Sequence, residues 1–173
     1  MDLKFYKPNA KTTGAAATFS FNDGSFYVQT VHQKSWDPSA KKGTFFNGKD
    51  KDHSTHMKFT VFEAGEMLDA IETYREATFF HSFGENKTQI SLTPWAQTRN
   101  AGKPSETTNR DFGFSATVNG SKKFRFSLYG GEVQVLKAFL MKFLLSAFTA
   151  SEYKRRDTAE ISEAVEEAPV VSE

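Results

Sequence analysis

The sequence predicts an α+β fold in which a four-stranded antiparallel sheet followed by one helix occurs twice. Residues 57–83 show the pattern first, because the apolar period is two in a short strand, about 3.6 in a helix and two again in the next strand. Residues 122–148 repeat this order, with an alternating strand, a Gly-Gly break and a helix that carries apolar residues at helical spacing. The rest of the chain contains enough alternating segments to complete both sheets.

Hairpin and loop signals define the first set of elements. Asn22-Asp23-Gly24 is a strong hairpin signal between two alternating segments, and residues 35–55 form a lysine-bearing loop region around one short strand. The helix is expected to bury Ala64, Met67, Leu68 and Ile71, with acidic residues on its solvent side. The four strands are predicted at residues 15–21, 25–34, 44–46 and 57–62, and the helix at residues 63–74.

Alternation also defines the second set. In residues 122–128, Phe124, Phe126 and Leu128 share one face, while Lys123 and Arg125 lie on the other. Residues 95–109 form a long polar loop between two of the strands. The four strands are predicted at residues 77–83, 87–94, 110–118 and 122–128, and the helix at residues 132–148.

Composition indicates one domain with a substantial core. The 173 residues include 18 Phe, mainly in alternating segments, and no Cys, so neither disulfides nor thiolate chemistry is expected. No segment reaches the ~18 apolar residues of a membrane helix, and the N-terminus lacks a hydrophobic signal segment. We therefore expect no membrane partner and a cytoplasmic protein.

The net charge of +1 conceals an asymmetry along the chain. Residues 157–173 contain six acidic residues and no Lys or Arg, whereas residues 1–156 contain all 22 basic residues and 15 acidic ones, a formal charge of +7 (22 minus 15). The expected organisation is a flexible N-terminal arm (residues 1–13), a nucleic-acid-binding domain (residues 14–150) and a disordered acidic tail (residues 151–173). The tail is expected to compete with nucleic acid for the basic domain or to recruit replication or repair proteins.

The predicted strands carry almost no acid, since only Asp111 lies within one, while several Lys and Arg lie in them or at their ends. A basic, hydroxyl-rich sheet face suits a phosphate backbone, and aromatic rings beside the cations suit stacking on unpaired bases. The candidate nucleic-acid-binding residues are Tyr27, Lys34, Trp36, Lys41, Lys42, Lys58, Lys87, Trp95, Lys122, Lys123 and Arg125.

Each of these features also has an ordinary structural explanation. An antiparallel sheet normally has one polar face, and an aromatic residue more often packs in a core than on a base. Catalytic and metal sites are not predicted, because His53 and His56 lack further ligands at suitable spacing and no nucleophile or phosphate-binding glycine motif occurs. No cofactor is expected, and the protein is predicted not to be an enzyme.

Four segments of the chain form a recognisable series: GAAATFSF (residues 14–21), KFTVFEAGEMLDAI (residues 58–71), ATFFHSF (residues 77–83) and VLKAFLMKFLLSAF (residues 135–148). Together they resemble the Whirly family of single-stranded DNA-binding proteins, which is related in fold to the transcriptional positive cofactor four group and to kinetoplastid mitochondrial RNA-binding proteins. The resemblance implies a homotetramer with central helices, outward sheets and single-stranded DNA along them, acting in DNA replication, recombination or repair.

The chain departs from the family at one motif and lacks a transit peptide. Where the family has Lys-Gly-Lys-Ala-Ala-Leu, Thr13 and Ala15 replace the two lysines around Gly14, so the family's larger assemblies are not expected. A bacterial or virus-infected cell therefore fits better than a plant organelle. Three alternatives stay open: an RNA-binding or RNA-annealing protein, a structural assembly protein without nucleic-acid function, and an OB-fold barrel in place of the predicted fold.

Overall fold

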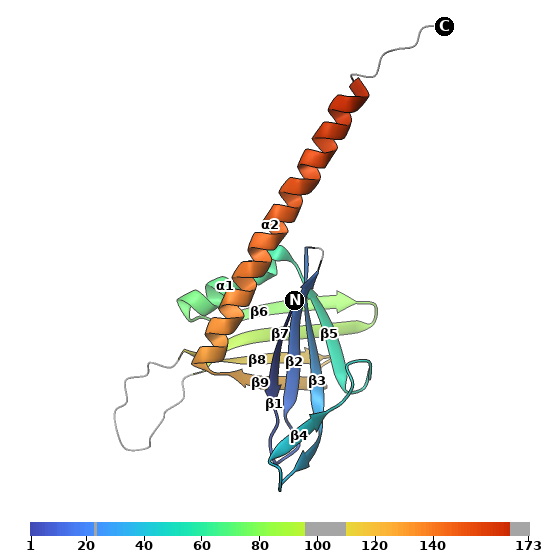
Figure 1. The fold of residues 1–173 in the computed structure, drawn as a ribbon. Helices are drawn as coiled ribbons and strands as arrows, with labels where there is room; N and C mark the ends of the chain where they lie inside the picture. The colour runs from blue at the N-terminus through green and yellow to red at the C-terminus, as the bar shows by residue number, and fades with distance from the viewer. Residues whose placement is uncertain (23, 96–109, 167–173) are drawn as a thin grey trace.

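Two antiparallel sheets, each followed by a helix, make up the protein (Figure 1). The computed structural model describes residues 1–22, 24–95 and 110–166, with residues 150–166 as backbone only. The first sheet contains β1 (Asp2–Lys7), β2 (Ala15–Asn22), β3 (Ser25–Asp37), β4 (Lys42–Phe45) and β5 (Ser54–Phe59), followed by α1 (Val61–Thr73). The second contains β6 (Ala77–Phe83), β7 (Asn86–Trp95), β8 (Asp111–Val118) and β9 (Lys122–Leu128), followed by α2 (Gly130–Glu166). The predicted twofold occurrence of sheet and helix is confirmed.

The strand order explains how the first sheet differs from the second. β6 to β9 lie in sequence order, whereas β3 is long enough to pair with β5 through residues 26–31 and with β4 through residues 33–37. β1 adds a fifth strand on the other side of β2.

Three sequence predictions need correction. The prediction of a flexible N-terminal arm is wrong for the residues of β1. This strand pairs with β2 over its whole length, and its Lys7 forms an ion pair with Glu132 of α2. The second helix does not end at Phe148, because α2 continues to Glu166 through much of the predicted tail. The strand before α1 ends at Phe59 and not at residue 62, because Thr60 is the N-cap of the helix. The loop at residues 96–109, Asp23 of the hairpin signal and residues 167–173 lie outside the described residues.

The apolar faces of the two sheets pack mainly against each other, with the strands of one sheet running across those of the other (Figure 1). Phe19 of the first sheet contacts Phe114 of the second with ring centroids 5.9 Å apart, and Phe59 contacts Phe79 at 5.6 Å. The helices alone therefore do not cover the apolar sheet faces. Sheet-on-sheet packing leaves each sheet a single outer face.

The helices cover the remaining apolar surface at one side of the two sheets. Phe143 of α2 packs on Phe26, with centroids 5.4 Å apart, and α1 packs along α2. The predicted buried residues of α1 are buried except Leu68, which is partly buried, while Ala70 is buried in addition. The predicted apolar face of β9 is buried throughout.

A glutamine side chain holds the loop between β1 and β2 against β3. Buried Gln33 accepts hydrogen bonds from the amides of Asn9 and Gly14 through Oε1, and its Nε2 donates to the carbonyls of Asn9 and Ser35. Gly14 leaves no room for a side chain, since a Cβ there would lie 2.2 Å from the Lys7 carbonyl oxygen. Position 14 therefore has space for glycine alone.

A capping box begins α1 and connects it to the second sheet. Thr60 Oγ1 accepts from the Glu63 amide, the Glu63 carboxylate accepts from the Thr60 amide, and Nε2 of His81 in β6 lies 2.8 Å from Glu63 Oε1. Burial of this carboxyl raises the pKa of Glu63, but the hydrogen bonds from Thr60 and His81 outweigh it, so the pKa lies below its ordinary value of 4.5.

The lowered pKa predicts that Glu63 stabilises the fold in a pH-dependent way. Because the unfolded chain binds the proton more tightly, this contribution is complete above about pH 5 and is lost as the pH falls through the folded-state pKa. Glu63→Gln should lower the free energy of unfolding by about 1 kcal/mol at pH 7, the usual scale for a helix cap, and by less at pH 3. Urea denaturation at both pH values tests this, with Glu85→Gln in the exposed β6–β7 turn as the control. The prediction would be contradicted if Glu63→Gln lowered the free energy of unfolding by the same amount at pH 7 and at pH 3.

Candidate nucleic-acid interface

The outer face of the second sheet brings together the largest group of predicted site residues. Alternation along β6 to β9 turns one polar set outward, which we call the second-sheet face. It consists of Thr78, Phe80, Ser82, Lys87, Gln89, Ser91, Thr93, Trp95, Ser115, Thr117, Lys123, Arg125 and Ser127. Four of them, Lys87, Trp95, Lys123 and Arg125, are candidates from the sequence, and all four side chains are exposed.

Among the described residues, the second-sheet face carries no exposed acidic side chain, since Asp111, which shares the face as the partner of Trp95, is buried. Glu76, just before β6, accepts a hydrogen bond from Thr93 Oγ1, and Asp111 at the start of β8 is buried with Oδ1 accepting from the Gly130 amide. Lys123 and Arg125 lie two residues apart on β9, an outermost strand of the sheet, so their charges add along one side of the face. Such a surface attracts a polyanion and offers hydroxyl groups for hydrogen bonding.

The outer face of the first sheet holds a second, smaller group. Tyr27 of β3 is paired with Lys58 of β5, and the Lys58 ammonium lies 5.9 Å from the centre of the Tyr27 ring. Lys4 and Tyr6 of β1 lie on the same face by alternation, and both are exposed. Because the sheets pack through their inner faces, this group and the second-sheet face look away from each other.

The hairpin of β3 and β4 collects four further candidates. Lys34 lies at the irregularity between Gln33 and Ser35, Trp36 is paired with Gly43, and Lys41 and Lys42 lie at and beside the turn. All three lysines are exposed and Trp36 is half-buried. The hairpin reaches beyond the body of the first sheet (Figure 1), so these residues form a separate basic projection.

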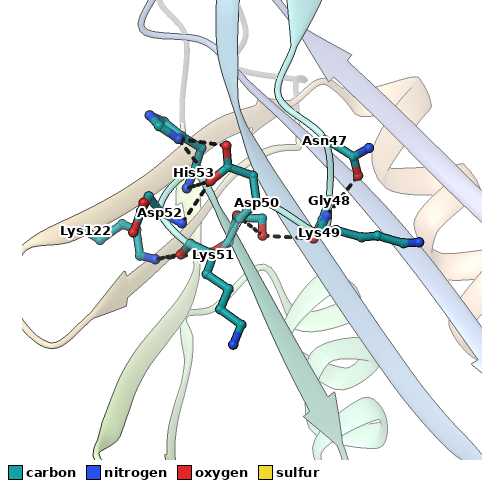
Figure 2. Close-up of polar contacts among 9 residues, drawn as sticks. Asn47, Gly48, Lys49, Asp50, Lys51, Asp52, His53 and Lys122 are labelled. Atoms are coloured by element: carbon teal, nitrogen blue, oxygen red, sulfur yellow. Dashed lines mark hydrogen bonds and ion pairs between the residues drawn. The ribbon is translucent and has the colours of Figure 1, made fainter.

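The loop between β4 and β5 is held by its own hydrogen bonds and by Lys122 (Figure 2). Asp50 Oδ1 accepts from the amides of Asp52 and His53, and the Lys122 ammonium donates to the carbonyl oxygens of Lys51, at 2.6 Å, and Ser54, at 3.3 Å. Figure 2 shows the Lys49 and Lys51 side chains pointing away from this network. The Lys122 side chain therefore ties the first sheet to β9, whereas Lys123 contacts the first sheet through its carbonyl oxygen, 3.1 Å from His32 Nε2, and leaves its side chain exposed.

This geometry predicts separate effects for neighbouring lysines. Lys122→Met removes two charge-assisted hydrogen bonds between the sheets and should lower the free energy of unfolding by about 1–2 kcal/mol. It should leave the salt dependence of nucleic-acid binding nearly unchanged, because the ammonium does not point outward. Urea denaturation and binding titrations measure the two effects. A normal stability with a shallower salt dependence would instead make Lys122 a phosphate contact.

Sequence reasoning missed Phe80 and Lys4. Phe80 is not among the candidates from the sequence, yet the ring is 65% exposed and faces outward. The signal was present in the sequence, because Phe79 and Phe80 are adjacent and only one of two neighbouring strand residues can face the core. Lys4 was missed because β1 was expected to be part of a flexible arm.

In the described parts of the chain, no group of three or more His, Cys, Asp or Glu side chains could hold a metal ion. His53 stacks on Phe46, with ring centroids 3.7 Å apart, and its Nδ1 lies 3.2 Å from Asp50. Neither described helix combines the length and apolar character needed to cross a bilayer.

The fold is similar to that of several solved structures. WHY1 from Arabidopsis thaliana is 14% identical, with a TM-score of 0.58 over 100% of this chain and 97% of that chain. The plant transcriptional regulator PBF-2 is 16% identical, with a TM-score of 0.53 over 88% and 86%. WHY3 from the same plant is 14% identical, with a TM-score of 0.57 over 93% and 96%. These likenesses confirm the predicted Whirly-like fold in place of an OB-fold barrel, whereas no protein-family model and no curated protein matches the sequence.

Proposed function

We propose that this chain is a non-enzymatic protein that binds single-stranded nucleic acid with little sequence preference. The observation that carries the proposal is the second-sheet face, where exposed cations, hydroxyl groups and two aromatic rings occur among the described residues with no exposed acidic side chain, Asp111 being buried. Cations neutralise phosphates, and rings stack on bases of any sequence, so the combination fits a strand whose bases are unpaired.

The arrangement favours a single strand over a duplex. Reading a duplex by its major groove requires a helix or a narrow two-stranded ribbon with basic side chains. α1 instead carries Glu63, Glu66, Asp69 and Glu72, and the basic residues of the second-sheet face lie on a broad sheet. The likeness in fold to WHY1 and PBF-2 supports a nucleic-acid role. We further propose single-stranded DNA as the ligand, with roles in replication, recombination or repair, in the cytoplasm of a bacterium or a virus-infected cell.

We also propose that the protein assembles into a homo-oligomer, with a tetramer as the expected state. Over residues 130–149, α2 exposes the apolar side chains of Val135, Met141, Leu145 and Phe148, and the last three follow one another at helical spacing on one side of the helix. Contiguous exposed apolar surface of this kind commonly marks a protein interface. Sedimentation velocity of the full chain should give the mass of an oligomer, and a monomer at micromolar concentration would contradict this part of the proposal.

The acidic residues after Arg156 have a regulatory role in this proposal. They would compete with nucleic acid for the basic faces or recruit replication or repair proteins. The α2 backbone reaches Glu166, so several of these residues continue the helix beyond the domain. Replacing the six acids by Asn or Gln, with the chain length unchanged, should strengthen binding if they compete. Unchanged affinity would contradict the competition and leave the recruitment of replication or repair proteins as the role of these acidic residues.

The test of the function is a fluorescence-anisotropy titration with a labelled thirty-base single strand, its duplex and an RNA of the same sequence, at 50 and 200 mM salt. We expect tighter binding of the single-stranded DNA than of the duplex, with a loss of affinity at the higher salt. Preference for the RNA would favour the RNA-binding alternative. No binding to any of the three would contradict the proposal and favour a structural assembly protein.

A further inference from the structure

Phe80 is an apolar ring in the middle of β6, an outermost strand of the mainly polar second-sheet face. Its neighbour Phe79 points inward and packs edge-on against Phe59, with centroids 5.6 Å apart. Alternation therefore turns Phe80 outward, where 65% of the residue is exposed. Burying a phenylalanine is a large part of what the residue contributes to stability, so an exposed ring in mid-strand contributes little to the fold of this chain.

The residues beside Phe80 form a row across all four strands. Phe80 is paired with Gln89, Gln89 with Thr117, and Thr117 with Lys123. Adjacent strands lie about 4.8 Å apart, so the row runs roughly 14 Å from the ring on β6 to the cation on β9. The next row ends at Arg125, which places both cations on the side of the face opposite to the ring.

We propose that Phe80 stacks on a base of a bound single strand whose phosphates contact Lys123 and Arg125. This assignment rests on the proposed function and names a residue for it. The π-face of Phe80 accepts any base, and Gln89, its direct neighbour, offers one amide donor pair and one acceptor to a base edge or a sugar. A nucleic-acid strand that crosses β6 to β9 thus contacts the Phe80 ring, the Gln89 amide, the Thr117 hydroxyl and the Lys123 ammonium in this order.

Trp95 contacts a different nucleotide in this arrangement. It lies six residues along β7 from Gln89, a distance of roughly 20 Å at the rise of an extended strand. Trp95 is also next to the buried carboxyl of Asp111, its cross-strand partner. Phe80 has only polar neighbours with no acid in its row, so it is the ring placed best for a polyanion.

The test uses Phe80→Ala in the full chain, with Phe83→Ala as the matched control. Phe83 lies on the same strand and is 88% exposed, but alternation places it on the other side. We expect Phe80→Ala to weaken binding of labelled oligothymidine about 5- to 150-fold, the range for one base–aromatic stack, without changing the salt dependence. An abasic strand of equal length should bind the wild type and Phe80→Ala equally, because it has no base to stack.

A second readout follows the ring directly. Phe80→Trp is made in a chain whose Trp36 and Trp95 are replaced by Phe. It should regain the affinity that Phe80→Ala loses, and its fluorescence should be quenched on adding oligothymidine. The fluorescence of Phe83→Trp in the same chain should not be quenched. The inference is overturned if the wild type binds and Phe80→Ala binds equally well, or if the abasic strand loses affinity to the same extent. A change in sedimentation mass with Phe80→Ala would make the ring a subunit contact instead. Absence of binding by the wild type would overturn the proposed function itself.

Discussion

We expect the replacement of Lys123 and Arg125 together by Ala to weaken binding of a single strand about tenfold or more at low salt and to make its salt dependence shallower. Each cation that neutralises a phosphate releases counterions, and the slope of log affinity against log salt changes by about 0.7 per phosphate for a single strand. Losing two contacts should therefore reduce the slope by about 1.4. Anisotropy titrations at four salt concentrations measure both quantities.

Lys41→Ala with Lys42→Ala is the charge-matched comparison for this variant. It removes two positive charges from the hairpin of β3 and β4 and leaves the second-sheet face intact. We expect a smaller loss of affinity and a smaller change of slope. Equal changes in the two variants would mean that binding follows overall charge, and the second-sheet face would lose its special role.

Gly14→Ala should be among the most destabilising single substitutions in the chain. The added Cβ would lie 2.2 Å from the Lys7 carbonyl oxygen and 2.5 Å from Gln33 Oε1. Relief requires moving β1 or breaking the hydrogen bonds of the buried Gln33 amide, so we expect a loss of about 3 kcal/mol or more in the free energy of unfolding. Urea denaturation followed by circular dichroism measures it.

Gly65→Ala provides the opposite case in the same chain. Gly65 lies in the interior of α1, and a Cβ there would meet nothing within 4 Å. Because alanine loses less conformational entropy in a helix, the substitution should raise the free energy of unfolding by about 0.5–1 kcal/mol. A Gly14→Ala protein as stable as the wild type would contradict the Gln33 arrangement, and Gly65→Ala shows whether the assay resolves small changes.

The elements were largely predictable because their signals are local. Periods of two and about 3.6 in neighbouring stretches identified eight of the strands within a few residues, and the Gly-Gly break identified the start of α2. β1 was not found because the polar residues around Pro8 resemble an arm, and its order depends on pairing with β2. The end of α2 was misplaced because its apolar periodicity stops near Phe148 while the helix continues.

The candidate site was only partly predictable, because only some of its features depend on local sequence. The sequence alone determined that Lys123 and Arg125 share one face of a strand, because alternation is a property of a strand by itself. Only the tertiary structure decided that Lys122 binds the carbonyls of a loop 71 residues earlier in the chain, that Tyr27 and Lys58 lie on another face, and that Phe80 stays exposed. The physical reason is that a side chain's partners depend on how the two sheets pack together, and that packing arises from contacts between residues far apart in sequence.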